Sequence, residues 1–242
     1  MMSQFSQIII LLVGLTTFVP AFSQDYYSEY GGDHRTAFYS VHVGRNSAVG
    51  AFKTNSYAQN GLTFGFHRGS APFINAYKFL KGTKLRMAYE YGTSVSLQRM
   101  GVRQLRQSFD VSLSDTTQYL HISSGGSLRL IHPIGKQFVL EFRAGLYPTI
   151  FVTPNLYSFY YNTDNGREEI ITTFEKRIQL QLSKQIGLTL RYWNLGLNVE
   201  YNWYQYNTET TILASNSDIS STFDFNGIVQ TVKITIAYYF PR

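Results

Sequence analysis

The stretch "VKITIAYYFPR", residues 232–242, alternates between two kinds of position. One set is entirely apolar: Val232, Ile234, Ile236, Tyr238 and Phe240. Successive side chains of a β-strand point to opposite faces, so this period of two predicts a strand with one apolar face. The apolar face ends with an aromatic residue, Phe240, which raises the question of what packs against this face.

The same period recurs along the chain, and no helical apolar period is sustained anywhere. We predict about eight strands separated by polar or turn-rich stretches. They lie at about 36–45, 61–68 (with an extension towards Phe79), 84–97, 117–131, 137–147, 188–206 and 223–242, with a sixth strand, between the fifth and the seventh, that ends in "KRIQLQLS" (176–183).

The end of the sixth predicted strand depends on one residue. Continuing that strand to Tyr192 would put Lys184 on its apolar face, so we predict a turn at residues 184–187. The alternation then changes parity at Trp193–Asn194, inside the next predicted strand. A change of this kind is what a β-bulge produces.

The connections between predicted strands alternate in character. Short turns are expected near 78–82, 132–136 and 184–187, and long polar loops near 46–60, 98–116, 152–170 and 208–222. An even number of strands, with short turns on one side and long loops on the other, is typical of small transmembrane β-barrels.

The charged residues decide which face of such a barrel meets water. Charged residues make up 15% of the chain, below the roughly 25% of a typical soluble domain, whereas aromatic residues reach 16%. The interior of an eight-stranded barrel is too narrow for every bulky apolar side chain. We therefore predict that the aromatic residues face lipid and that a charge network fills the barrel; a soluble barrel or sandwich is the alternative. The predicted network comprises Arg86, Glu90, Glu141, Arg143, Arg191, Glu200 and Lys233.

The first residues predict export. The apolar run from Ile8 to Val19 is shorter than the roughly 20 residues of a membrane-spanning helix, and Ala21 and Ser23 supply a small-x-small cleavage pattern. We therefore predict a cleaved signal peptide at 1–23, a short periplasmic lead-in at 24–35 and a barrel at 36–242.

With its alternating strands and its ending "ITIAYYF" (234–240), the sequence resembles the small outer-membrane β-barrel proteins of Gram-negative bacteria. The resemblance implies an all-β, closed, antiparallel up-and-down transmembrane barrel in the cell outer membrane, and a monomer. It also implies that Tyr238 and Phe240 form the signal read by the barrel-assembly machinery during insertion. Pro241 and Arg242 follow this signal, where the family usually ends at or near the Phe.

Two further patterns suggest chemistry. His121 and Ser123 share a strand face, and Glu141 has like parity on the next predicted strand, which resembles the His-x-Ser pattern of outer-membrane lipid A deacylases. Ser124 stands where that family has Asn, and polar filling of the interior is the alternative. The second pattern is the loop at 98–110, where Arg99, Arg103 and Arg106 are candidates for binding lipopolysaccharide phosphates; a solvated loop without a binding role is the alternative.

Other classes of function find no support in the sequence. There is no cysteine, the five histidines lack ligand spacing, and no glycine-rich phosphate loop opens a helix, so we expect no metal and no cofactor. No basic run with interleaved aromatics suggests nucleic acid. We expect a structural or interaction role through loops that contact outer-membrane lipid or an extracellular partner. The alternatives are a lipid A acyl hydrolase and a narrow channel for small solutes.

Overall fold

The computed structural model describes residues 37–55, 58–75, 85–101, 112–113, 118–134, 138–153, 156–162, 167–174, 178–213 and 220–241. The predicted signal peptide and periplasmic lead-in lie outside these residues. Among the residues described, no helix is long and apolar enough to cross a membrane.

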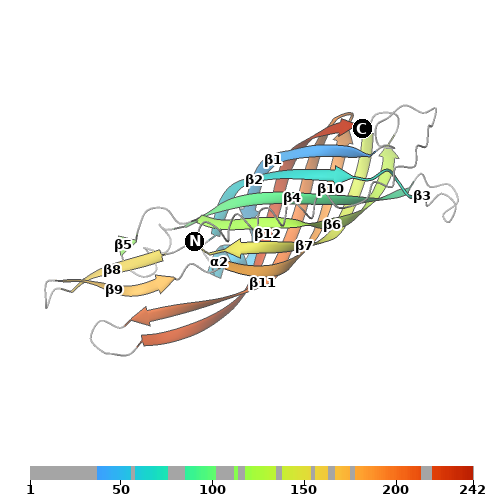
Figure 1. The fold of residues 1–242 in the computed structure, drawn as a ribbon. Helices are drawn as coiled ribbons and strands as arrows, with labels where there is room; N and C mark the ends of the chain where they lie inside the picture. Colours follow the sequence, from blue (N-terminus) through green and yellow to red (C-terminus); the bar gives the residue numbers. More distant parts are fainter. Residues whose placement is uncertain are drawn as a thin grey trace, which may run out of the picture.

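Eight long strands form a closed barrel (Figure 1). They are β1 (Phe38–Ala48), β2 (Ala58–Gly69), β4 (Arg86–Met100), β6 (Gln118–Ile134), β7 (Phe138–Val152), β10 (Ile178–Tyr192), β11 (Leu195–Leu213) and β12 (Ser220–Pro241). Each is antiparallel to its neighbours in the chain, and β1 pairs with β12 from Phe38–Pro241 to Ala48–Thr231. That last pairing closes the barrel, as the sequence predicts.

Shorter elements lie in the connections: α2 (Gly50–Asn55), β3 (Ile74–Asn75), β5 (Ser112–Leu113), β8 (Leu156–Asn162) and β9 (Arg167–Phe174). β8 pairs with β9, and β9 pairs with β11 at Thr210–Ile212. Figure 1 shows β8, β9 and the paired ends of β11 and β12 projecting from one end of the barrel. We call this the loop end, and the opposite end, which holds Tyr192 and Phe240, the turn end.

One predicted boundary is wrong. β10 runs without a break through residues 184–187 to Tyr192, and β11 begins at Leu195, opposite it. The change of parity at Trp193–Asn194 is therefore a two-residue hairpin and not a bulge. The predicted turn was placed too early because Lys184 does lie on the outward, apolar face of β10, where it is exposed.

The hairpin carries a local strain that can be measured. Trp193 has a φ of 52°, in the left-handed region that glycine tolerates and β-branched residues avoid. We expect a Trp193→Gly variant to be more stable than a Trp193→Val variant by about 1 kcal/mol. Urea unfolding of both in lipid vesicles checks this, and both variants equally lack the tryptophan side chain. Equal stability, or a more stable valine variant, would contradict it.

The remaining connections differ in detail from the predictions. β6 continues to Ile134 before β7 begins at Phe138, so the turn predicted at 132–136 is shifted along the chain. Beyond Gly69, Ser70 N–H still donates to the Tyr89 carbonyl, and β3 resumes the pairing with β4. This pairing with β4 follows the predicted extension of the second strand as far as Asn75. The turn predicted near 78–82 lies outside the described residues. The predicted loops at 46–60, 152–170 and 208–222 contain helix or strand.

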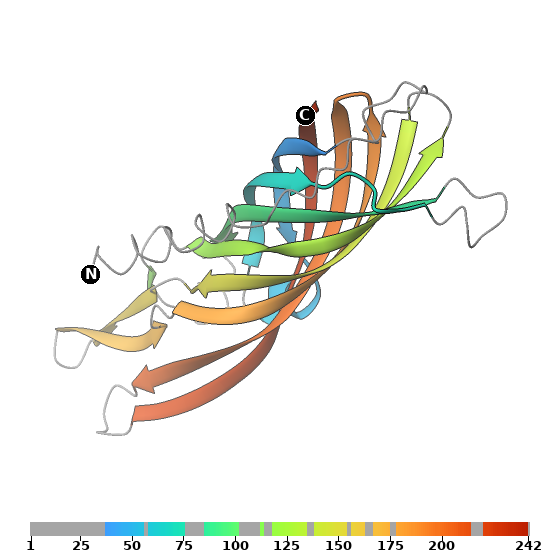
Figure 2. The same cartoon turned by 45° about the vertical axis from the view of Figure 1, so that its right-hand side comes forward.

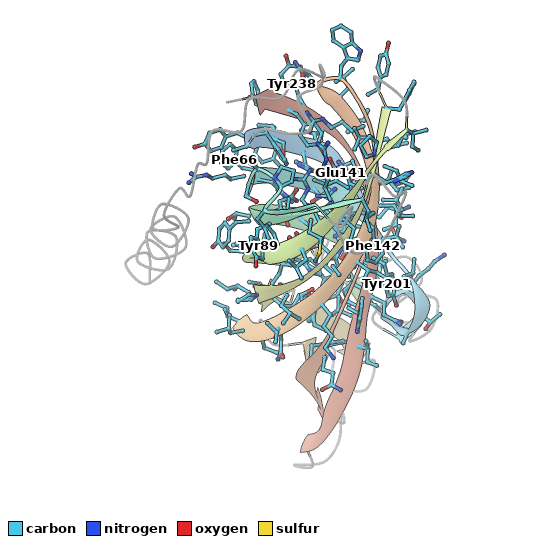
Figure 3. The ribbon with its side chains drawn as sticks, turned by 90° about the vertical axis from the view of Figure 1, so that its right-hand side faces the viewer. Phe66, Tyr89, Glu141, Phe142, Tyr201 and Tyr238 are labelled. Carbon is cyan, nitrogen blue, oxygen red and sulfur yellow. The ribbon has the colours of Figure 1, made fainter. Side chains whose placement is uncertain are left out.

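Burial alternates along every barrel strand, and the apolar side faces outward. Leu62, Leu180 and Ile236 are 73%, 74% and 65% exposed, whereas Glu141 is 0% exposed. Figure 3 shows Phe66 and Tyr89 on the outside of the wall and Glu141 within it. A soluble barrel has the opposite arrangement, so that alternative fails.

Candidate functional site

The centre of the barrel interior is Glu90 on β4, which receives side chains from three other strands. Its Oε1 lies 2.7 Å from Nη1 of Arg143 on β7 and 2.8 Å from Nδ1 of His67 on β2. Its Oε2 lies 3.3 Å from Nε of Arg129 on β6. All of these groups are buried, so each charge depends on its partners and not on water.

The other two buried carboxylates extend this network around the barrel. Two nitrogens on one edge of the Arg129 guanidinium face Glu141: Nη2 lies 2.7 Å from Oε1, and Nε donates to Oε2 at 3.1 Å. Arg191 Nη1 lies 4.0 Å from the same carboxylate, and Arg143 Nη2 lies 3.3 Å from Glu200. Two-point arginine pairing fixes orientation as well as charge, so these contacts tie β6, β7, β10 and β11 together across the interior.

Asn198 on β11 links the charges to the neutral polar groups. Its Oδ1 accepts from Arg143 Nη2 and from the Thr189 hydroxyl, each at 2.6 Å. Its Nδ2 lies 3.1 Å from the Thr235 hydroxyl and 3.2 Å from His42 Nδ1. The hydrogen bonds therefore reach β10, β12 and β1, and polar contacts span the barrel at this level.

Aromatic rings close the turn end of the interior. Phe38 and Tyr239 meet edge to face with ring centres 5.0 Å apart. The Arg129 guanidinium lies 4.5 Å from the Phe38 ring centre, and that of Arg191 lies 4.5 Å from the Tyr239 ring centre. Both cations are buried, where cation–π contact stabilises them most.

A second aromatic group closes the loop end, and we call it the aromatic cap: Phe52, Tyr119, Phe151, Tyr204 and Tyr206. Phe52 comes from α2, which folds between β1 and β2, and it is 0% exposed. Its ring centre lies 5.3 Å from that of Tyr119 and 6.1 Å from that of Phe151. The first turn of α2 is held to β12, where Ala51 N–H donates to Gln230 Oε1.

Most of the predicted interior charges meet in this network. Glu90, Glu141, Arg143, Arg191 and Glu200 are all buried and within ion-pair distance of a partner. Lys233 is also buried and donates to the Ser94 hydroxyl at 3.0 Å, and Arg86 is half-buried at the turn end of β4. Arg129 was missed, although it has inward parity on the predicted strand at 117–131. His67 and Asn198 were missed too, because pairing partners on other strands cannot be read from alternation.

His121, Ser123 and Glu141 are not brought together. His121 lies opposite Phe151 on β7, whereas Glu141 lies opposite Ile131, ten residues further along β6. At roughly 3.3 Å per residue this separates the carboxylate from the imidazole by about 33 Å along the strands. His121 Nδ1 contacts the Tyr204 hydroxyl at 2.6 Å, and the Ser123 hydroxyl contacts that of Thr149 at 2.9 Å. The geometry supports polar filling.

The other predicted site residues lie on the outside of the barrel or beyond the described part. Arg99 is exposed near the loop end of β4, whereas Arg103 and Arg106 lie outside the described residues. Tyr238 and Phe240 face outward on β12, with ring centres 4.7 Å apart. Within the described ranges, no group of three or more His, Asp or Glu side chains is placed to hold a metal ion.

The outer wall and the interior together define the class of protein. Exposed Leu, Ile, Val and Phe side chains surround a closed set of paired strands, and the buried charges lie inside. Only helices and closed barrels satisfy every backbone polar group within hydrocarbon, and this barrel has no open edge in its wall. The protein is an eight-stranded β-barrel of the membrane-spanning kind.

Comparisons with known proteins gave matches among solved structures. No known protein family and no curated protein sequence matches the chain. Among solved structures, it is similar to the outer membrane protein OprG from Pseudomonas aeruginosa, at 11% identity and a TM-score of 0.45 over 88% of this chain and 100% of that one. It is also similar to a major outer membrane protein from Thermus thermophilus, at 14% identity and a TM-score of 0.41 over 85% of this chain and 100% of that one.

Proposed function

We propose that this protein is a closed outer-membrane anchor that presents its loop end to lipid or to an extracellular partner. The observation that carries the proposal is the filled interior. Paired charges centred on Glu90 occupy the middle of the barrel, with the Phe38–Tyr239 pair on one side and the aromatic cap on the other. An interior occupied by its own side chains at three levels favours anchorage over transport.

The loop end supplies the surface for contact. β1 pairs with β12 only as far as Ala48–Thr231, and β10 pairs with β11 only as far as Lys184–Trp203. β11 and β12 continue to pair with each other as far as Leu213–Ser220, which carries them about 30 Å further along the strands. Figure 2 shows this hairpin and the β8–β9 hairpin side by side beyond the barrel. A sheet of this size offers a partner far more surface than a short loop.

A narrow channel is the competing function, and conductance separates the two. In planar bilayers at neutral pH we expect the purified protein to insert without a steady open level, because the interior charges pair with one another. An open porin inserted in the same bilayers serves as the positive control. A steady, reproducible conductance from the protein would replace the anchor with the channel.

Two further measurements test which membrane holds the protein and which end of the barrel faces the outside of the cell. The protein should fractionate with outer membranes, and protease added to intact cells should cut at the loop end and leave the barrel strands protected. Fractionation with the inner membrane, or protection of the loop end, would contradict the proposal. His121 and Ser123 receive no chemical role in it, because Glu141, the acid predicted to complete the set, lies about 33 Å from His121 along the strands.

A further inference from the structure

Lys184 interrupts the apolar outer wall. It is exposed on β10, and its outward neighbours along the strand, Leu182 and Ile186, are 53% and 41% exposed. A lysine on the lipid face is costly at the middle of the bilayer and much less costly near the head groups. A charge inside this wall therefore marks a level in the membrane and requires a partner there.

The strand geometry places Lys184 towards the loop-end leaflet. It lies eight residues from Tyr192 at the turn end, which is about 27 Å of strand and roughly 20 Å along the axis of a barrel whose strands tilt by about 40°. The apolar band of such barrels is about 25 Å tall. The flexible stem of a lysine carries its ammonium group from this depth up to the head groups.

Lys184 belongs to a row of directly paired outward positions. It lies opposite Trp203 on β11, which lies opposite Gln230 on β12. The Trp203 ring stacks on that of Tyr201 with centres 5.4 Å apart, and Gln230 Nε2 donates to the Tyr201 hydroxyl at 2.9 Å. We call these four residues the Lys184 patch. Its rings are held in place by one another, and Trp and Tyr are the side chains that favour the head-group level.

The charges of the outer wall indicate what kind of partner fits. Among the residues whose side chains the structure describes, all three carboxylates, Glu90, Glu141 and Glu200, point into the barrel and are buried. The outward charges among these described wall residues are all basic: Arg45, Arg68, Arg99 and Lys184. A second copy of this described wall thus offers Lys184 no carboxylate, whereas a lipid phosphate brings an anion to the level of the ammonium group.

We propose that the Lys184 patch binds the phosphate of an anionic lipid in the leaflet at the loop end. The inference rests on the proposed function in one respect, which is that the barrel lies in a membrane. The Lys184 ammonium group pairs with the phosphate, the Trp203 indole N–H is a further donor, and the acyl chains follow the apolar wall towards the turn end. This assigns a lipid contact to the barrel wall itself and not to the loops.

Native mass spectrometry of protein released from nanodiscs tests the site. The nanodiscs contain equal amounts of phosphatidylcholine and phosphatidylglycerol, and the measurement is the amount of each lipid retained per protein. We expect wild type to retain mainly phosphatidylglycerol and Lys184→Gln to retain about tenfold less of it, since a charge-assisted contact is lost. Lys184→Arg keeps the cation and should retain it. Arg68→Gln, with the same loss of charge nearer the turn end, is the matched control and should behave as wild type.

Four results would overturn the inference: equal retention of both lipids by wild type, equal phosphatidylglycerol retention by wild type and Lys184→Gln, an equal loss in Arg68→Gln, or displacement of the lipid by millimolar inorganic phosphate. The last would identify a site for free phosphate in place of a lipid. A steady conductance in planar bilayers would end the anchor proposal and leave this result readable, because lipid retention does not depend on whether the barrel conducts.

Discussion

Replacing Glu90 by glutamine is expected to lower the free energy of unfolding by about 3–5 kcal/mol. Glu90 faces three basic side chains, His67, Arg129 and Arg143, and is 2% exposed. Glutamine keeps the size of the side chain but removes the charge, so the two guanidinium groups lose an anion that water cannot replace. Breaking a buried pair from one side leaves the other charge buried and uncompensated, which is the costly case.

Urea unfolding of the protein in lipid vesicles measures this loss as a shift of the unfolding midpoint. Glu200→Gln is the matched control, because Glu200 is also a buried inward carboxylate but, among the described residues, pairs with one arginine, Arg143 at 3.3 Å. We expect a clearly smaller loss in the control. A loss below about 1 kcal/mol for Glu90→Gln, or equal losses in both variants, would show that Glu90 is not the centre of the network.

The alternation of apolar and polar residues predicts most of the fold, because the alternation is a local property of each strand. Which side chains of a strand point inward depends only on parity, so Glu90, Glu141, Arg143 and Glu200 were placed inside correctly. Which of them meet depends on register between strands. His121 and Glu141 have the parity required for contact but lie about 33 Å apart along the strands, because His121 is near the loop end of β6 and Glu141 is near the turn end of β7. Alternation does not contain this register.

The misplaced turn has a different cause. A charge on an apolar face is a sound reason to end a strand of a soluble protein, but the outer wall of a membrane barrel tolerates a lysine near the head groups. Trp193 and Asn194 also gave no glycine or proline to mark a hairpin, and a change of parity fits a two-residue turn as well as a bulge. Lys184 therefore indicates a level in the membrane and does not mark the end of a strand.

The aromatic cap lay beyond sequence reasoning for a third reason. Phe52 belongs to a six-residue helix within a stretch predicted as a polar loop, residues 46–60. Nothing in that stretch shows that the chain folds back over the barrel mouth. The partners of Phe52 come from β6, β7 and β11, at distant points of the chain. Only closure of the barrel brings these strands together beneath α2.

Phe52→Ala is accordingly expected to lower the free energy of unfolding by about 3–5 kcal/mol, the usual loss for truncating a fully buried phenylalanine. It removes a ring that contacts Tyr119, Phe151, His121 and Tyr206. Phe52→Leu keeps most of the apolar volume and should lose much less. Urea unfolding of both variants in vesicles measures the difference. Equal stability of the alanine variant and wild type would mean that α2 does not hold the cap closed.

The Phe52→Ala variant also tests which layer of the interior blocks ions, the aromatic cap or the paired side chains nearer the turn end. Although Phe52→Ala weakens the aromatic cap, it leaves the charges around Glu90 and the Phe38–Tyr239 pair unchanged, and these lie nearer the turn end. We therefore expect no steady open level from Phe52→Ala in planar bilayers, because ions that pass the cap still meet a layer of paired side chains. A steady conductance from this variant alone would place the barrier at the cap, and α2 would then be a removable plug and the charge network a lining that ions can cross.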